Sequence, residues 1–268
     1  MTPRQSRAIV LMYHAVAYGL GEGNAADAHY TVSVASFKRH LAIAKASGLQ
    51  LVSVARQLVT SSASRCVALT FDDGHASSSD AAHLIGAVGG CADFFVNSST
   101  VGTPHMVSWQ ELRSMSATGM SIQSHGHTHR YLDSLPPAEV HDELLRSKKM
   151  IEDKVGAPVT LFAPPGGRMR ADLPNVAATL GYAAVCSSKV GVWKLDERAR
   201  EIPRFAVLAT TTDDRLRSWL EQRASEIAKA RVRHAVLSGA KRTLGTRRYE
   251  QLRALLQGSE ARPADGVR

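Results

Sequence analysis

Two neighbouring carboxylates follow a short apolar segment of the sequence. Asp72 and Asp73 come directly after Val67–Phe71, whose composition is typical of a buried strand. Because side chains alternate in direction along an extended chain, the two carboxylates should have different partners. One could hold a metal ion while the other accepts a proton. The alternative is a structural one, since Asp-Asp-Gly also forms helix caps and tight turns.

Three histidines within five residues follow another apolar segment. His125 and His129 are four residues apart, which predicts that both imidazoles lie on one side of a helical turn and can bind one ion. His127 lies between them and should point elsewhere. Two histidines and one carboxylate from a different strand would make a three-ligand site with open positions, which suits Zn²⁺ or another divalent ion.

A loop of prolines and glycines, Pro164–Gly167, follows a third apolar segment and precedes Arg168. Prolines fix the turn, and glycines allow a backbone N–H to approach a ligand closely, as a donor to an oxyanion must. The pattern alone predicts only a rigid loop. Its position after a strand is what makes it a candidate part of a site.

The elements that must position these residues are short strands alternating with helices. Helices are predicted over Ser36–Lys45 and Pro137–Val155, with Ser36 and Ser108 as signals of helix starts. Alternation of this kind predicts an α/β fold with a parallel sheet, and about seven units should close into a distorted (β/α)7-type barrel. The predicted strands are Ile9–Met12, Leu49–Val54, Val67–Phe71, Ala92–Val96, Met120–Gln123, Val159–Phe162 and Ala183–Val185.

The net charge of +9 is concentrated near the C-terminus. Residues 1–197 contain 17 basic and 16 acidic side chains, whereas residues 198–268 contain 16 and 8. A helical pattern runs from Asp213 to Gln257 with arginines between its apolar positions. We therefore predict a barrel over residues 1–207, a basic helical appendage over 208–257 and a disordered tail over 258–268.

Cysteine usage and apolar segments indicate the compartment. Cys66, Cys91 and Cys186 are widely separated, which argues against a disulfide framework or a thiolate zinc site and favours reduced core thiols. The first apolar run, Ala8–Met12, is too short for a secretion signal, and none approaches the ~18 residues of a membrane span. We expect a cytoplasmic protein.

Together these motifs resemble the polysaccharide deacetylase (NodB-homology) family of metal-dependent carbohydrate de-N-acetylases. Thr70–Gly74 is similar to the family's first motif, His125–His129 to its second and Phe162–Gly167 to its third, which is usually Arg-Pro-Pro-Tyr-Gly. Leu11–Val16 also looks like the opening strand of many bacterial members. The resemblance spans roughly residues 8–207 and implies a distorted barrel of about seven strands and helices.

The resemblance also implies roles for individual residues. Asp73, His125 and His129 would bind the metal, most simply Zn²⁺, with Co²⁺, Ni²⁺ or Mn²⁺ as alternatives, and Asp72 would be the general base. The backbone N–H of Gly166 would help to hold the tetrahedral oxyanion. We also expect Pro165, Gly167, Arg168 and Arg204 to contribute to substrate binding.

The sequence departs from the family pattern at three points. Ala163 stands where the third motif usually has an arginine that orients the catalytic aspartate, and Arg168 or Arg204 is expected to substitute for it. Gly166 replaces the aromatic residue of that motif, which should open the mouth of the site. The late histidine that serves as general acid is missing, so His14 is the first candidate for a replacement acid or a substrate contact, followed by His75 and His127.

The expected reaction is removal of an N-acetyl group from an N-acetylated sugar, either nucleotide-linked, lipid-linked or a glycan intermediate, with release of acetate. One alternative is the same machinery acting on a non-sugar amide or formamide, and another is a catalytically silent glycan-binding module. Nucleic acid is not expected as a partner, because the chain lacks a recognisable nucleic-acid module. The arginines beyond Arg198 suggest either a solvated face or peripheral contact with an anionic membrane. The sequence leaves the oligomeric state open.

Overall fold

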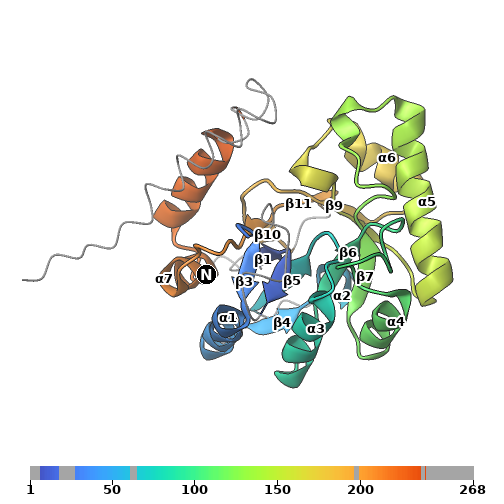
Figure 1. The fold of residues 1–268 in the computed structure, drawn as a ribbon. Coiled ribbons are helices and arrows are strands. Elements are labelled where there is room, and N and C mark those ends of the chain that lie inside the picture. The colour runs from blue at the N-terminus through green and yellow to red at the C-terminus, as the bar shows by residue number, and fades with distance from the viewer. Residues whose placement is uncertain (1–6, 18–27, 61–64, 196–198, 237–238, 240–268) are drawn as a thin grey trace, which may run out of the picture. The chain divides into compact units, whose positions relative to one another are not determined.

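A nearly closed, barrel-shaped sheet of mostly parallel strands forms the centre of the fold (Figure 1). The computed structural model describes residues 7–17, 28–60, 65–195, 199–236 and 239. The hydrogen-bonded order is β10-β1-β5-β6-β7-β8-β9-β11, while β12 also pairs with β1 and β4 with β5. These strands are β1 (Arg7–Tyr13), β4 (Gln50–Val52), β5 (Cys66–Phe71), β6 (Asp93–Val96), β7 (Ser121–Ser124), β8 (Leu161–Phe162), β9 (Ala184–Cys186), β10 (Trp193–Lys194), β11 (Glu201–Ile202) and β12 (Phe205–Ala206). The predicted α/β barrel is therefore confirmed.

Between β3 (Thr31–Ser33) and β9 a helix connects each strand to the next, as the alternation of the sequence predicts (Figure 1). They are α1 (Val34–Ala46), α2 (Val54–Thr60), α3 (Ser78–Ala87), α4 (Trp109–Ala117), α5 (Pro137–Val155), α6 (Leu173–Thr179) and α7 (Asp213–Leu220), with short 3-10 turns η2 (Leu132–Ser134) and η3 (Pro165–Gly167). A separate small sheet pairs β2 (Ala15–Ala17) with β3 (Thr31–Ser33). The predicted range of α5 is confirmed, and Ser108 forms the expected capping box at the start of α4. The predicted cap of α1 at Ser36 is wrong, because the extended residue Ser33 accepts the amide hydrogen of Ser36 and caps a helix that starts at Val34.

The first strand aligns the ends of its neighbours. β1 runs parallel to β5 in a register that places Tyr13 opposite Phe71, and the amide of Asp72 donates to the carbonyl of Tyr13 at 2.9 Å. All residues of β1 after Arg7 are buried. Because the two strands end together, His14 and Asp72 emerge side by side at the carboxyl-terminal edge of the sheet.

Two late strands complete the pairing of β1 on its other side. β10 is antiparallel to β1 at Arg7, whereas β12 is parallel and pairs Phe205 with Leu11. Arg204 directly precedes β12 and is thereby brought to the same edge of the sheet as the end of β5. Arg204 thus reaches the end of β5, which lies in the first third of the chain.

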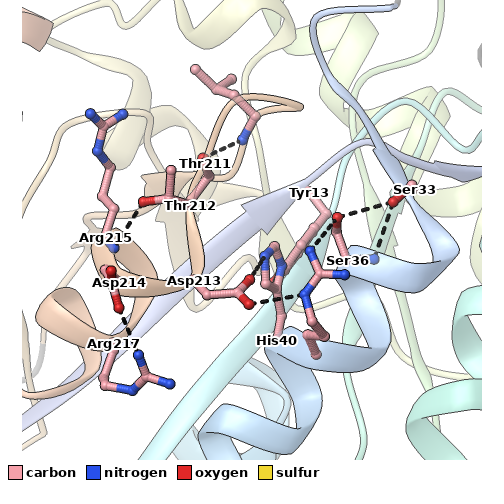
Figure 2. Close-up of polar contacts among 12 residues, drawn as sticks. Tyr13, Ser33, Ser36, His40, Thr211, Thr212, Asp213, Asp214, Arg215 and Arg217 are labelled. Carbon is pink, nitrogen blue, oxygen red and sulfur yellow. Dashed lines mark hydrogen bonds and ion pairs between the residues drawn. The ribbon is translucent and has the colours of Figure 1, made fainter. Parts of the chain in front are cut away.

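Helix α7 attaches to α1 through a polar cluster beside β1, shown in Figure 2. The hydroxyl of Tyr13 lies 3.2 Å from Nδ1 of His40, and Oδ1 of Asp213 lies 3.9 Å from Nε2 of the same ring. Arg39 donates through Nε to the other oxygen of Asp213 at 2.9 Å. His40 is only 2% exposed, and burial lowers the pKa of its imidazole to about 4 although Asp213 raises it.

The chain divides into two units, residues 1–223 and 224–268. Helices are present in the described part of the region where the helical pattern runs from Asp213 onward: α7 ends at Leu220, Gln222 has a φ of 56°, and helical structure begins anew at 224 and continues to 236. Amide hydrogen bonds from 222 and 223 back to the last turn of α7 close that helix. The remainder of the predicted appendage, residues 240–257, and the predicted tail lie outside the described residues.

The three cysteines are free and buried, as expected for core thiols. Among the helices that the structure describes, none combines the length and the apolar character needed to cross a bilayer.

Candidate metal centre

Three side chains from two strand ends converge on one point. Oδ1 of Asp73 lies 3.1 Å from Nε2 of His125 and 3.2 Å from Nε2 of His129, and the ligand atoms of all three lie within 4.8 Å of one another. Burial alone would raise the pKa of Asp73, but hydrogen bonds from the two histidines hold it well below its usual range. One carboxylate and two imidazoles fit a divalent ion such as Zn²⁺.

The two histidines do not lie on a helical turn, so that expectation is wrong. β7 ends at Ser124, and the chain then follows an irregular path in which Gly126 has a φ of 88° and His129 a φ of 60°. These left-handed positions reverse the chain, so the imidazoles of His125 and His129 approach to 5.4 Å between ring centroids.

A buried glutamate of α5 holds this loop. Glu143 accepts hydrogen bonds from the backbone amides of His127 and Thr128, both at 2.9 Å, and from the hydroxyl of Thr128. Its side chain is 6% exposed and lies on the buried face of α5 between Val140 and Leu144. The sequence analysis did not select Glu143, although a carboxylate at an apolar position of an amphipathic helix was a usable signal.

A carbonyl of the third motif orients His125. Nδ1 of His125 lies 2.8 Å from the carbonyl oxygen of Ala163, which is an acceptor, so Nδ1 carries a proton and donates it to that carbonyl. Nε2 faces Asp73, and loss of its proton would leave its lone pair available to a cation. This arrangement is typical of metal-binding histidines, whose second nitrogen donates to a carbonyl or carboxylate.

Asp72 is not one of the three clustered side chains and forms a buried ion pair with Arg204. Nη1 and Nη2 of Arg204 donate to the two carboxylate oxygens of Asp72 at 2.7 and 2.9 Å. Nε donates to the carbonyl of Ser187 at 3.1 Å, and Arg204 is fully buried. Burial would raise the pKa of Asp72, but the guanidinium outweighs it and the pKa is lowered. Asp72 is therefore an oriented anion.

Arg168, the other arginine considered for that position, lies elsewhere. Its Nη1 is 3.4 Å from Oδ2 of Asp133, and its guanidinium stacks 4.2 Å from the ring centroid of Tyr131. Of the two arginines, the structure brings only Arg204 to Asp72.

The glycines of the third motif form a tight turn against other loops. Gly166 and Gly167 have φ values of 62° and 64°. A Cβ on Gly166 would lie 2.6 Å from Cε1 of Tyr131, and one on Gly167 would lie 2.4 Å from Oγ of Ser188. The expectation that Gly166 opens the mouth of the site is wrong at this point, because the ring of Tyr131 occupies the space. Pro165, which is buried, packs beside the loop of the two histidines.

His14 follows β1 and stacks on Tyr30, with 4.3 Å between ring centroids. Its Nδ1 is buried and has no hydrogen-bond partner among the residues that the structure describes. Burial lowers the pKa of His14, although Asp73 and Asp72 raise it. A neutral imidazole with an unused nitrogen therefore lies near both carboxylates.

Comparisons with known proteins agree with this arrangement. The family model described as polysaccharide deacetylase matches residues 60–185, which include all three motifs but neither His14 nor Arg204. The provisionally named polysaccharide deacetylase YxkH of Bacillus subtilis (strain 168) is 25% identical over 212 residues, covering 77% of this chain and 73% of its own.

Two solved structures show the same fold. BC0361, a polysaccharide deacetylase from Bacillus cereus, has 25% identity and a TM-score of 0.69 over 82% of this chain and 69% of its own. The Streptococcus pyogenes deacetylase PplD, solved in complex with acetate, has 23% identity and a TM-score of 0.70, covering 78% of this chain and 95% of its own.

Proposed function

The chain carries a polysaccharide deacetylase domain, and on this premise we propose that it removes an N-acetyl group from an N-acetylated sugar, releasing acetate and a free amine. One observation carries the proposal. The cluster of Asp73 with two histidines adjoins a second carboxylate, Asp72, that a buried arginine keeps ionised and oriented. A structural metal site would need only the first of these two features.

Asp73, His125 and His129 would hold a divalent cation, with Zn²⁺ as the first choice. A cation held there polarises an amide carbonyl and lowers the pKa of a water molecule. The carbonyl of Ala163 fixes the ring of His125 so that its Nε2 is available as a ligand.

Asp72 would accept the proton of the attacking water. It is adjacent in sequence to Asp73 and would lie near a cation held there, and its two hydrogen bonds to Arg204 restrict its rotation. General-base catalysis of this kind contributes about 10²–10⁴ in rate. Arg204 is then a positioning residue that acts through Asp72.

His14 would contact the substrate at the same edge of the sheet. Since burial lowers its pKa, the imidazole is neutral and can donate or accept a hydrogen bond without carrying charge. That favours a contact with the amide or the departing amine over a role as a permanently protonated acid. The amide of Gly166 remains our candidate oxyanion donor, and Pro165 and Gly167 shape the turn that presents it.

Two alternative functions predict different experimental results. The same machinery could act on a non-sugar amide or formamide, which comparing acetate with formate release across a panel of N-acyl substrates would reveal. A silent glycan-binding module would bind sugar without releasing acetate. The buried Asp72–Arg204 pair argues against the silent module, because desolvating two charges is costly and metal binding alone does not need them.

The test is acetate release from N-acetylhexosamines presented as nucleotide-linked, lipid-linked and oligosaccharide substrates, with added Zn²⁺. We expect release from at least one class, and a loss of about 10²–10⁴ in kcat for Asp72→Asn. Asp142→Asn is the matched control, since that carboxylate is exposed and pairs with Arg146 on the surface of α5. Acetate release by Asp72→Asn at the rate of the unchanged protein would refute the proposed role.

A further inference from the structure

A surface hollow of about 210 Å³ lies beside the metal centre. Val16 and Ala17 line it, and they follow β1; His75 and Asp80 line it from the segment that follows β5. Because β1 and β5 are parallel and end in register, the hollow lies on the same carboxyl-terminal edge of the sheet as Asp73. Its side chains take no part in the chemistry described above.

The hollow is fixed close to the metal cluster by the backbone. His75 is two residues beyond Asp73, so their Cα atoms are at most about 7 Å apart. The turn between them is tight, with φ values of 73° at Asp73 and 75° at Gly74, and a Cβ on Gly74 would lie 3.0 Å from Cγ1 of Val96. The position of His75 therefore follows from the turn that places the metal ligand.

Hydrogen bonds determine which nitrogen of His75 carries the proton. The amide of Ser77 donates to Nδ1 of His75 at 3.2 Å, so Nδ1 is an acceptor and the ring N–H is on Nε2. The hydroxyl of Ser77 lies 2.9 Å from Nδ1 and itself accepts the amide hydrogen of Val16 at 3.1 Å. With Nδ1 already used, Nε2–H is the group that His75 has left to donate.

Two more polar side chains line the same hollow. Asp80 and His105 are both exposed, and within the described part of the chain neither side chain makes a hydrogen bond or an ion pair. His105 has a φ of 67°, which is uncommon for a residue with a side chain and costs free energy. Its carbonyl accepts the amide hydrogen of Ala76 at 2.9 Å, which ties this strained residue to the segment after β5.

We propose that this hollow binds a sugar ring of the acetylated substrate, with Nε2–H of His75 donating to one hydroxyl and the carboxylate of Asp80 accepting from another. The inference rests on the proposed function and names a binding site for its substrate. A fixed donor and a fixed acceptor suit a ring whose hydroxyl groups can do both. The volume is below the roughly 300–1,000 Å³ of pockets for drug-sized ligands, which matches a single ring.

The direct test measures binding, so that it does not depend on turnover. Isothermal titration calorimetry would follow a soluble N-acetylglucosamine oligosaccharide binding to the Asp72→Asn protein, and then to the same protein with His75→Ala or Asp80→Asn added. Loss of one hydrogen bond should weaken Kd about three- to tenfold in each case. His83→Ala is the matched control, because that histidine is exposed on α3, where its Nδ1 lies 2.9 Å from the carbonyl oxygen of Ser79. An unchanged Kd for both variants would overturn the proposal.

Kinetics separate this proposal from the proposed function. With Asp72 intact, His75→Ala should raise KM for the oligosaccharide more than it lowers kcat. Acetate release with the same KM in the unchanged protein and both variants would overturn the sugar site and leave the deacetylase intact. Weakened binding in the variants of a protein that releases no acetate from any N-acetylated sugar would support the sugar site and remove the proposed function.

Discussion

The guanidinium of Arg204 binds both carboxylate oxygens of Asp72, although the two residues are 132 positions apart in the chain. The arginine that the third motif lacks is thus supplied from a different part of the sequence. It comes from the segment before β12, outside the residues 60–185 that the family model matches. The orientation of the candidate base therefore depends on strands that close the barrel.

The contact between Arg204 and Asp72 predicts that the positive charge of the arginine is not sufficient without its planar pair of donors. Arg204→Lys keeps a positive charge but loses the planar pair of donors, so we expect kcat for acetate release to fall about tenfold or more. Arg204→Ala leaves a buried carboxylate unpaired and should lower the free energy of unfolding by about 3–5 kcal/mol. Urea denaturation and initial rates measure the two effects. Arg200→Lys is the control, because Arg200 is exposed and donates to Asn175, and it should change neither kcat nor the free energy of unfolding. An Arg204→Lys protein with full kcat would contradict the positioning role.

The metal cluster predicts a sharp difference between neighbouring histidines. His129→Ala removes one of three ligands and should reduce Zn²⁺ affinity by several orders of magnitude, measured by competition with a chromogenic chelator. His127→Ala should bind Zn²⁺ as the unchanged protein does, because Nδ1 of His127 bonds the hydroxyl of Ser98 at 2.8 Å and lies outside the cluster. Equal Zn²⁺ affinity in both variants would show that the ion binds elsewhere.

The contact between Gly166 and Tyr131 predicts coupled effects on stability. Gly166→Ala places a methyl group against the tyrosine ring and a side chain at a positive φ, and the two effects should cost about 2–4 kcal/mol in unfolding free energy. Adding Tyr131→Ala should relieve the steric part, leaving a coupling energy of about 1–3 kcal/mol in a double-mutant cycle. Gly119→Ala, at a positive φ with open space around it, controls for the backbone cost alone. Strict additivity would show that the ring does not occupy the space above Gly166.

The burial of His40 predicts a loss of stability in acid. The folded imidazole has a pKa of about 4, whereas an unfolded histidine has about 6.5, so the unfolded state binds more protons between these values. Its contribution is complete above about pH 6.5 and is lost as the pH falls toward 4, by roughly 2–3 kcal/mol. His40→Gln should flatten this part of the profile when unfolding is measured by urea at successive pH values.

The difference between the two proteins is the meaningful quantity in that experiment. Burial raises the pKa of Asp93 to about 7, which makes its own contribution fall as the pH rises over the same range. Because Asp93 is present in both proteins, its effect cancels in the comparison. His83→Gln at an exposed position should reproduce the unchanged profile, and an identical profile for His40→Gln would contradict the assigned burial effect.

Sequence reasoning recovered the parts of the fold that local pattern determines. The strand before Asp72 and the helix Pro137–Val155 follow from apolar periodicity, and both are present. The short strands β10, β11 and β12 were not predicted, since each has two residues and is stabilised by pairing across the barrel. Pairing between segments distant in sequence leaves no local periodicity to read.

The sequence identified which residues form the site, but not how the chain brings them together. Asp73, His125 and His129 were selected together and they do converge, but the path between the histidines depends on left-handed residues and on Glu143. Sequence alone left Arg168 and Arg204 as equal alternatives. Only the pairing of β12 with β1 distinguishes them, because it brings Arg204 to the end of β5.

The position of β1 in the sheet has a consequence for the order of events during synthesis. β1 leaves the ribosome well before β10 and β12, the strands that pair with it, which contain residues near 193 and 205. Such long-range pairing is slow, because the entropy of closing a long loop is lost before the contacts form. A nascent chain that ends before Arg204 would carry all three motifs and still lack the arginine that orients Asp72. Under the proposed function, chains that stop there should release no acetate.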